Sequence, residues 1–279
     1  MSRAPGNDVS LWQGVINWPR VYACGQRFVL IKATEGDDLQ DTFFKNNWAG
    51  AKSAGLLRGA YHFFRCNVDP VIQADYFINF VKSTNDIGEL PPCLDIETTE
   101  EKTKGEIVPM VKVWLDRVEA AFGRKPIIYS NYFFLKDNLS EANLEPPTWA
   151  KDYPLWLAQY LDAYSDSSQP DLPPGWAKWT FWQYSKAGHV DGIEENVVDM
   201  VVFTGSLDDL HKFAGGTIPA AAATQTQMAS SATQKTYMVQ AGDTLISIAV
   251  KNGTTPQALA SLNNVNKKDI IPGKVLKLP

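Results

Sequence analysis

Short runs of apolar and β-branched residues recur along the first 203 residues of the chain. The run Phe28-Val29-Leu30-Ile31 is apolar at every position, which is typical of a strand buried on both faces. By this criterion the sequence predicts eight strands, at 8–13, 28–34, 57–63, 91–97, 126–131, 155–160, 179–185 and 197–203.

Segments with the periodicity of amphipathic helices separate the early strands. Gly55 and Gly123 follow two of these segments, at positions where a left-handed residue commonly ends a helix. The predicted helices cover 41–54, 69–81 and 106–122. After Asn131 the connections become short and rich in Pro, Ser and Asp. The pattern predicts an α/β barrel with about five βα units followed by three strands with few helices.

Two carboxylates stand at the end of the apolar run 90–94. Asp95 and Glu97 are two residues apart, so on a strand their side chains point to the same face, with Cα atoms about 6.5 to 7 Å apart. Two carboxyls held close in a partly dry site do not both ionise easily, so one keeps its proton while the other stays charged. Glycoside hydrolysis uses this division of labour, although a solvated strand end or half of a metal site has the same pattern.

Two further acids lie on the first and last predicted strands. In such barrels the reacting groups collect at the C-terminal ends of the strands. The first and eighth strands are neighbours in a closed barrel, so we expect Asp8 and Asp199 to lie side by side. They would then face Asp95 and Glu97 across the barrel mouth. Taken alone, each is also compatible with a turn or edge acid.

Nine motifs follow one another in order over residues 5–205. They are DVS at 8–10, FVLIKATEG at 28–36, GAYHF at 59–63, QADYF at 73–77, LDIE at 94–97, IYSN at 128–131, WLAQY at 156–160, WQY at 182–184 and VD at 198–199. Together they resemble glycoside hydrolase family 25, the Chalaropsis-type lysozymes.

This resemblance implies a (β/α)5(β)3 TIM-like barrel that cleaves the β-1,4 bond between N-acetylmuramic acid and N-acetylglucosamine in peptidoglycan. It maps the general acid onto Glu97 and its partner onto Asp95. The partner is either a nucleophile or the group that steadies the substrate's own 2-acetamido oxygen. Asp8 and Asp199 complete the acidic quartet. The resemblance implies no metal ion and no cofactor.

The aromatic residues fit a sugar site, because aromatic rings stack on the apolar faces of pyranoses while a few polar groups fix orientation. We predict that Trp156 and Trp182 are sugar platforms, whereas Trp48 and Trp114 occupy helical core positions. His62 is predicted to be a hydrogen-bonded interior residue. The predicted polar contacts to the substrate are Lys32, Glu35, Tyr61, Tyr129 and Gln159.

A change of composition divides the chain. Residues 1–213 form the predicted catalytic domain, and residues 214–235 are low in aromatics and almost free of charge, which is typical of a flexible linker. Residues 236–279 resemble a lysin motif (LysM) domain, with a βααβ order of strand 237–240, helices at 244–252 and 256–263, and strand 274–278. The resemblance implies a module that binds glycans containing N-acetylglucosamine.

The predicted glycan groove of the small domain lies between two segments. Its candidate residues are Gly242, Asp243, Thr244, Leu245, Asn263, Ile271, Pro272 and Gly273. Asp243 is equally compatible with a cap at the start of the first helix.

Charge is distributed unevenly over the two predicted domains. The chain has a net charge of −5, with 20 basic and 29 acidic residues up to Phe213 but five Lys and two Asp from Thr236 onward. A basic module on an acidic enzyme suits docking on an anionic cell wall. The pI near 5.3 argues against nucleic acid as a partner. The three cysteines predict buried thiols rather than a disulfide framework.

The N-terminal residues 1–10 lack the charged-then-apolar order of a signal peptide, and no apolar run reaches about 18 residues, so no membrane insertion is expected. We therefore expect synthesis in the cytoplasm of a host bacterium and action on the wall after release with the help of a holin. That behaviour resembles a phage endolysin, which we expect to be monomeric.

Two other functions fit parts of the pattern. The quartet of acids could hold Mg²⁺ or Mn²⁺ in a metal-dependent barrel hydrolase, since carboxylate oxygens suit such ions. Against this, the chain has only three histidines and no H-x-x-x-H spacing. A non-catalytic glycan-binding protein on a hydrolase scaffold normally has the general acid replaced, whereas Glu97 is present here.

Overall fold

The computed structural model describes residues 2–140, 145–215, 236–240, 243–244, 247–249, 252, 256–263, 265, 270–271 and 273–278. The chain divides into two compact units, Met1–Ala223 and Thr224–Pro279. The predicted domain ends at 213 and 236 stay a prediction, because residues 216–235 lie outside the described part.

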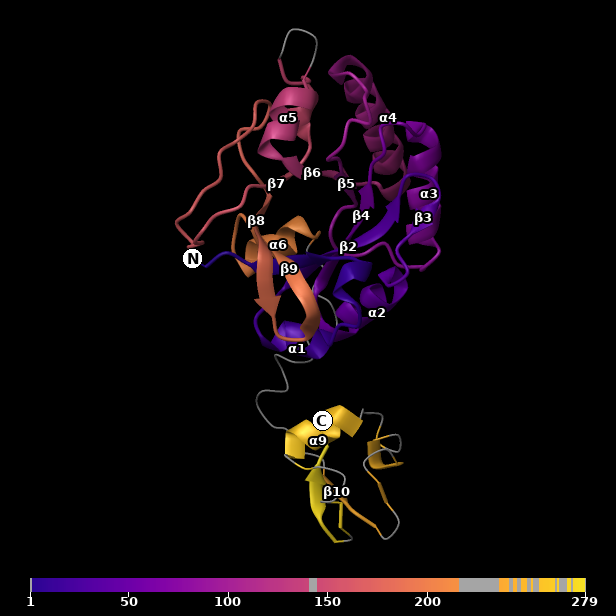
Figure 1. The fold of residues 1–279 in the computed structure, drawn as a ribbon, viewed down its shortest axis with the longest axis vertical. Coiled ribbons are helices and arrows are strands. Elements are labelled where there is room, and N and C mark those ends of the chain that lie inside the picture. The colour runs from indigo at the N-terminus through magenta and orange to yellow at the C-terminus, as the bar shows by residue number, and fades with distance from the viewer. Residues whose placement is uncertain are drawn as a thin grey trace. The chain divides into compact units, whose positions relative to one another are not determined.

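A closed barrel forms the centre of the larger unit (Figure 1). Its described strands are β1 (Pro5–Val9), β2 (Phe28–Glu35), β4 (Leu57–Phe63), β5 (Cys93–Asp95), β6 (Ile127–Asn131), β7 (Leu155–Ala158), β8 (Phe181–Val190) and β9 (Ile193–Phe203). The first seven of these strands, β1 to β8 without β3, run parallel to one another, whereas β9 runs antiparallel to both β8 and β1 and closes the barrel. The short β3 (Leu39–Gln40) pairs with the end of β2.

Each of the first five barrel strands is followed by a helix. These helices are α1 (Trp18–Ala23), α2 (Phe44–Ala54), α3 (Pro70–Lys82), α4 (Lys104–Phe122) and α5 (Tyr132–Asn138). The remaining described helical segments of this unit are α6 (Leu207–Phe213) and the 3-10 turns η1 (Leu11–Gln13) and η2 (Ala150–Asp152). The order of elements confirms the predicted (β/α)5(β)3 barrel.

Local chemistry sets the ends of the helices. Asp69 accepts hydrogen bonds from the first free N–H groups of α3, and Pro70 occupies a position that needs no donor. Thr103 and Glu106 form a capping box at the start of α4. Gly55 and Gly123 have φ values of 89° and 68° and end α2 and α4 in the left-handed region, as predicted.

Four predicted strands have clearly different ends in the structure. The first stops at Val9 because the Ser10 side chain accepts the N–H of Trp12, and Gln13 accepts the N–H of Ser10, which begins a 3-10 turn. The strand predicted at 91–97 covers only Cys93–Asp95, since the two prolines before it have no N–H for a ladder. The last two strands form a hairpin that extends well past the predicted ranges, and its Gly192 carbonyl accepts the N–H of Asn17.

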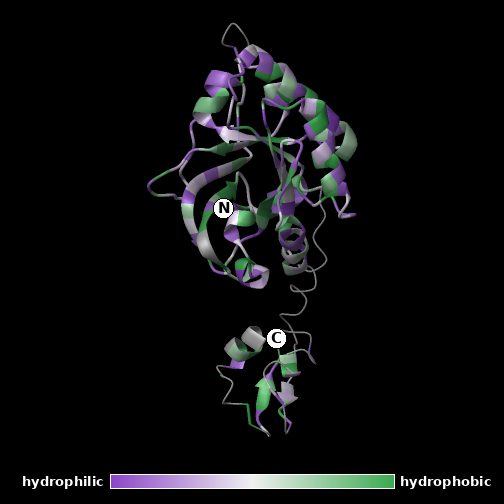
Figure 2. Ribbon diagram, turned by 45° about the vertical axis from the view of Figure 1, so that its right-hand side comes forward, coloured by the Kyte–Doolittle hydropathy of each residue, from purple (hydrophilic) through white to green (hydrophobic). Residues whose placement is uncertain are grey.

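Apolar residues recur along the barrel strands (Figure 2), and their side chains are buried on both faces, as predicted from the continuous apolar runs. Val29 and Ile31 belong to the layer between strands and helices, whereas Phe28 and Leu30 point into the barrel. Inside the barrel the rings of Phe28 and Phe181 lie 5.1 Å apart. These rings fill one end of the barrel, so space for a ligand remains at the other end.

The smaller unit has its own apolar core. Strands β10 (Thr236–Met238) and β11 (Val275–Lys277) pair antiparallel, and α9 (Pro256–Asn263) follows the helical residues 247–249. These elements agree with the predicted strands and second helix. The core consists of Val239, Ile248, Ala249, Leu259 and Leu276.

Candidate active site

A pocket opens where the parallel strands end, and all four predicted acids line it. The pocket brings together residues from all eight barrel strands, as expected for this architecture. The pocket is lined by Asp8, Val9, Ser10, Trp12, Gln13, Lys32, Tyr61, Phe63, Asp95, Glu97, Tyr129, Trp156, Gln183 and Asp199.

Asp95 and Glu97 reach the pocket from the end of β5. Asp95 is the last residue of the strand, and its side chain is 5% exposed. Glu97 stands two residues beyond it and is exposed. The backbone between them continues the strand direction, because the N–H of Ile96 bonds to the carbonyl of Tyr129 at 3.1 Å. The predicted projection of both side chains to one face is confirmed, although Glu97 itself lies outside the strand.

The electrostatics of this pair favour a retained proton. Burial raises the pKa of Asp95 well above the usual range, and the charge of Glu97 raises it further. Partial desolvation of its carboxyl in the pocket raises the pKa of Glu97, as does the charge of Asp199. The two carboxyls influence each other's pKa, and Asp95 Oδ1 is buried without a hydrogen-bond partner. One proton shared by the pair relieves the repulsion between two close carboxylates.

Asp8 and Asp199 face each other across the β1–β9 ladder, where they are direct Cα partners. This confirms that they lie side by side. Asp199 stands in the middle of β9 rather than at its end as expected, because β9 is antiparallel and passes the rim. Gln183 Nε2 donates to Asp8 Oδ2 at 2.8 Å.

Burial also dominates the titration of this second pair. It raises the pKa of Asp8 well above the usual range, and the charge of Asp199 adds to the effect. Burial raises the pKa of Asp199 as well. The hydrogen bond from Gln183 lowers the pKa of Asp8, because the amide stabilises the carboxylate in place of part of the water that burial removes.

Four of the seven predicted substrate-binding residues line the pocket, namely Lys32, Tyr61, Tyr129 and Trp156. Trp156 is only 1% exposed and packs against Tyr129, with ring centroids 4.3 Å apart. Tyr129 Oη donates to Gln183 Oε1 at 2.9 Å. Trp156 therefore supports the aromatic floor of the pocket and offers little open ring face as a platform.

The other three predicted binding residues lie outside the pocket lining. Trp182 is fully buried in the outer layer, and its Nε1 donates to the carbonyl of Gln159 at 2.8 Å. Gln159 uses its side chain to bind Asp171. Glu35 pairs with Lys32 and Arg65. The side chains of these three residues are engaged by the protein itself, and their contact with the substrate stays a prediction.

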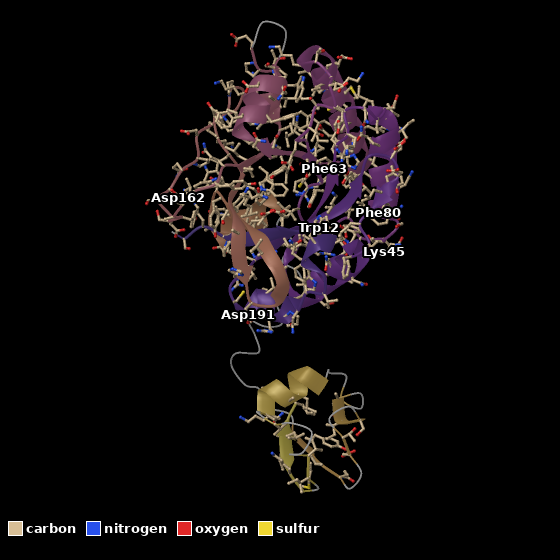
Figure 3. The ribbon with its side chains drawn as sticks, viewed as in Figure 1. Trp12, Lys45, Phe63, Phe80, Asp162 and Asp191 are labelled. Carbon is tan, nitrogen blue, oxygen red and sulfur yellow. The ribbon has the colours of Figure 1, made fainter. Side chains whose placement is uncertain are left out.

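Trp12 and Gln183 are pocket residues that the prediction missed. Trp12 is 71% exposed on the turn after β1, and together with Phe63 it is labelled in Figure 3. Gln183 belongs to the motif WQY, and strand alternation could have indicated it, because its neighbour Trp182 faces outward and Gln183 must face inward. Trp12 lies two residues after the motif DVS, and no sequence pattern indicated that it lines the pocket.

The buried histidine and the cysteines have structural surroundings. His62 bonds to Thr34 and Gln73, and burial lowers its pKa to about 4, so the predicted interior role is confirmed. The three cysteines are free thiols; Cys66 and Cys93 are buried as predicted, but Cys24 is exposed. Within the described residues, no group of three or more His, Cys, Asp or Glu side chains is arranged to hold a metal ion, and no helix is long and apolar enough to span a membrane.

The predicted groove residues of the small unit have mixed surroundings. Thr244 Oγ1 accepts the N–H of Ser247 at 3.1 Å, and Asp243 accepts from Tyr237 Oη at 2.8 Å. Asn263 Nδ2 donates to the carbonyl of Lys277, and Asn263 Oδ1 accepts the N–H of Lys277. Ile271 is 60% exposed, and Gly273 occupies a turn with φ of 89°. Three predicted residues lie outside the described residues, namely Gly242, Leu245 and Pro272.

Comparisons with known proteins agree with this architecture. Residues 7–193 match the model of glycosyl hydrolases family 25, and residues 237–279 match that of the LysM domain. Lysozyme M1 of Streptomyces globisporus is 37% identical over 227 residues, covering 77% of this chain and 73% of that protein. N,O-diacetylmuramidase of Chalaropsis is 32% identical over 222 residues, covering 76% and 99%.

A solved structure gives the same result. The bacterial lysozyme from Streptomyces coelicolor superposes with a TM-score of 0.66 at 33% identity, covering 77% of this chain and 99% of that one. The chain belongs to glycosyl hydrolases family 25 and carries a LysM domain. The family and the enzyme class predicted from the motifs, a glycoside hydrolase, are therefore confirmed.

Proposed function

We propose that this protein is an N-acetylmuramidase that cleaves the β-1,4 bond between N-acetylmuramic acid and N-acetylglucosamine in peptidoglycan. One observation carries the proposal. An exposed carboxyl, Glu97, and a buried carboxyl, Asp95, line the same pocket at the barrel mouth. Relatives named lysozyme and muramidase support the choice of substrate.

Glu97 is the general acid in this proposal. Its exposure lets it approach the glycosidic oxygen of a bound strand, and the proton shared by the Asp95/Glu97 pair is retained towards neutral pH because the pKa values of both carboxyls are raised. Asp95 lies deeper, where a carboxylate with one unpartnered oxygen can stabilise positive charge at the anomeric carbon. The buried carboxylate acts as a nucleophile or steadies the substrate's 2-acetamido oxygen, and both roles use the same placement.

Asp8 and Asp199 tune the site rather than transfer the proton. Their charges contribute to the raised pKa values of the Asp95/Glu97 pair, since Asp8 acts on Asp95 and Asp199 acts on Glu97. The amide of Gln183 binds Asp8 and accepts from Tyr129. Gln183 thus links Asp8 to Tyr129 on the aromatic floor. These hydrogen bonds fix the side of the pocket on which the sugar would lie.

Substrate contacts are assigned to residues that line the pocket. Lys32 and Tyr61 offer polar groups, and Tyr129 offers ring area. Trp12, which is 71% exposed at the rim, adds an aromatic side chain on which an adjoining sugar of the strand can stack.

The LysM domain is proposed to hold the enzyme on the wall. Its basic charge suits the anionic wall, and 46 residues of the chain are 50% identical to the N-acetylmuramoyl-L-alanine amidase sle1 of Staphylococcus saprophyticus. Because the two modules bind one polymer, the LysM domain raises the local concentration of the barrel at its substrate. Peptidoglycan glycan strands are thus the partner of both modules.

Release into the wall is a further part of the proposal. We infer that the enzyme is made in a bacterial cytoplasm, as a monomer, and reaches the wall when a holin opens the membrane. Expression in a bacterium with a susceptible wall tests this. Lysis should follow only when the membrane is permeabilised, and spontaneous lysis without permeabilisation would contradict it.

Product analysis tests the muramidase activity directly. Purified walls treated with the enzyme should gain reducing ends that borohydride labelling identifies as muramic acid, without new free amino groups. Reducing ends on glucosamine would indicate the opposite bond, and new amino groups would indicate an amidase or peptidase. Full activity in the presence of a chelator separates this chemistry from a metal-dependent hydrolase, and any catalytic release of fragments excludes a glycan-binding protein without activity.

A further inference from the structure

The proposed general acid stands outside the regular structure of the barrel. Strand β5 ends at Asp95, so Glu97 has no ladder hydrogen bonds of its own strand to hold it. An acid that must meet one oxygen of the substrate needs tighter placement than a free loop provides, because a misplacement of about 1 Å can cost a factor of about 10² in rate. On the strand side, Ile96 is held because its N–H bonds to the carbonyl of Tyr129 and its carbonyl accepts from Ser130 Oγ. On the other side of Glu97, the contacts of the residues that follow it supply the placement.

Glu100 supplies most of those contacts. Its carboxylate accepts the backbone N–H of Cys66 through Oε2 and the Thr98 hydroxyl at 2.7 Å through Oε1. The Cys66 thiol in turn reaches the carbonyl of Thr98 at 3.2 Å. These bonds tie the segment after Glu97 to the segment after β4, on the neighbouring strand.

The backbone is strained where this clamp forms. Glu100 and Glu101 have φ values of 43° and 66°, the left-handed region that non-glycine residues rarely occupy. Such a conformation persists when surrounding contacts overdetermine it. Glu100 has those contacts, while the adjacent Glu101 is exposed.

Arg65 connects this clamp to the pocket. Its Nη1 donates to Glu100 Oε1 at 2.9 Å, and its Nε donates to Glu35 Oε1 at 2.9 Å. Glu35 Oε2 accepts from Lys32 Nζ at 2.6 Å, and Lys32 lines the pocket. The chain Glu100, Arg65, Glu35, Lys32 thus crosses the ends of β2, β4 and β5. All four side chains are at least partly buried, so the charges are less screened than those of surface pairs.

We propose that Glu100 and Arg65 are positioning residues, which hold the Glu97 segment in register with the pocket through a clamp outside the pocket. The inference rests on the proposed role of Glu97 as general acid. It assigns a role in catalysis to two residues that do not line the pocket and to the ion pairs of Glu35, which the sequence suggested as a substrate contact.

The test compares Glu100→Ala with Glu101→Ala. Both positions carry the same charge and the same left-handed backbone, so Glu101→Ala controls for net charge and strain. On soluble muropeptide chains, Glu100→Ala should lower kcat about 10- to 100-fold with KM changed by less than about threefold, while Glu101→Ala stays within about twofold of the parent. Equal effects of the two changes would overturn the proposal.

A second substrate separates acid placement from general damage. An aryl β-glycoside of the wall disaccharide with a nitrophenolate leaving group needs little protonation of the departing oxygen. On this substrate the loss for Glu100→Ala should shrink to less than about threefold. A loss as large as that on the natural glycan would show that the substitution distorts the site, and the positioning role would be wrong.

Coupling between the two positioning residues is measured with Arg65→Met. If the residues act as one clamp, the double variant should lose no more kcat than the more severe single variant. Glu100→Gln keeps one acceptor oxygen, which can bind the Cys66 N–H, but it replaces the oxygen that Thr98 and Arg65 contact by a donor, so it should recover only part of the activity lost in Glu100→Ala. Multiplicative losses in the double variant would show independent roles.

The failure of this inference can be told from failure of the proposed function. If Glu97→Gln is active, the acid assignment is wrong, whatever Glu100→Ala does. If Glu97→Gln is inactive while Glu100→Ala keeps parental kcat, only the clamp is wrong. In the Glu97→Gln background, adding Glu100→Ala should cause no further loss, because no acid remains to be placed.

Discussion

The acids of the barrel and the polar motif residues of the small unit differ in what their side chains contact. In the barrel, Asp95 keeps one buried oxygen without a partner and Glu97 is exposed in a pocket. In the small unit, Thr244 bonds to Ser247 at a helix start, and Asn263 joins α9 to β11. The barrel acids and the polar residues of the small unit all belong to motifs of their families. Only the barrel acids lower the stability of the fold that holds them.

This difference distinguishes motif residues that act on a ligand from motif residues that stabilise the fold. A buried carboxyl with incomplete hydrogen bonding destabilises the protein and is retained for what it does to a ligand. A polar side chain that satisfies its own backbone stabilises the fold and leaves little for a ligand. We therefore expect substitutions in the barrel site to change activity strongly and substitutions at Thr244 or Asn263 to change mainly stability.

The largest expected effect is that of Glu97→Gln. The amide is nearly isosteric but has no proton to give, so wall lysis should fall about 10²- to 10⁴-fold while wall binding and melting temperature are kept. Asp95→Asn should be similarly severe. Turbidity loss of purified walls measures both variants, and lysis by Glu97→Gln within about fivefold of the parent would remove the assignment.

Asp8→Asn and Asp199→Asn should have smaller effects on kcat. These acids act indirectly, because their charges raise the pKa values of the Asp95/Glu97 pair and they help to place the sugar. We expect losses of about 10- to 10²-fold, less than for Glu97→Gln.

The pH profile of activity sharpens this prediction. Activity requires the proton on Glu97, so it falls as pH rises through the raised pKa of Glu97. Removing the charge of Asp199 lowers that pKa, and the alkaline limb should move to lower pH.

Removal of the small unit tests its role without touching the barrel. A chain that ends at Ala214 keeps the complete barrel core and should turn over soluble muropeptide chains at the parental rate. On dilute intact cells it should lose about tenfold or more in lysis, because the effective concentration at the wall is lost. Equal lysis of dilute cells would contradict targeting, and slower turnover of soluble chains would indicate direct contact with the barrel.

Most of the barrel and the four acids could be predicted from the sequence, because continuous apolar runs and ordered motifs determine strand order. The errors come from effects that a linear pattern does not contain. Ser10 ends β1 through its own side chain, and the antiparallel β9 puts Asp199 in the middle of a strand. Trp182 pairs with Leu157 and faces outward with it, whereas Trp156 faces inward. A shift by one residue decides which face a strand residue occupies.

Buried acids should also reveal themselves in stability. Asp8 and Asp95 have raised pKa values in the folded protein, so their ionisation opposes folding as pH rises above the unfolded pKa. Asp95→Asn should therefore raise the melting temperature at pH 7, by about 2–4 °C for each kcal/mol of relief in a unit of this size. The gain should vanish at about pH 3.5, below the usual aspartate pKa of about 3.9, where the parent carboxyl is protonated in both states. A gain that is independent of pH would point to packing instead of charge.

The smallest expected effect is on the small unit itself. Asn263→Ala removes three hydrogen bonds, two of them to the backbone of Lys277, and should lower the free energy of unfolding of this unit by about 1–3 kcal/mol. Turnover of soluble chains should not change. Ile271 provides the matched comparison, because its side chain is 60% exposed. Ile271→Ser should leave stability within about 0.5 kcal/mol and weaken wall binding instead. If Asn263→Ala weakened wall binding while Ile271→Ser did not, the polar motif residues would be glycan contacts and the contrast with the barrel acids would be lost.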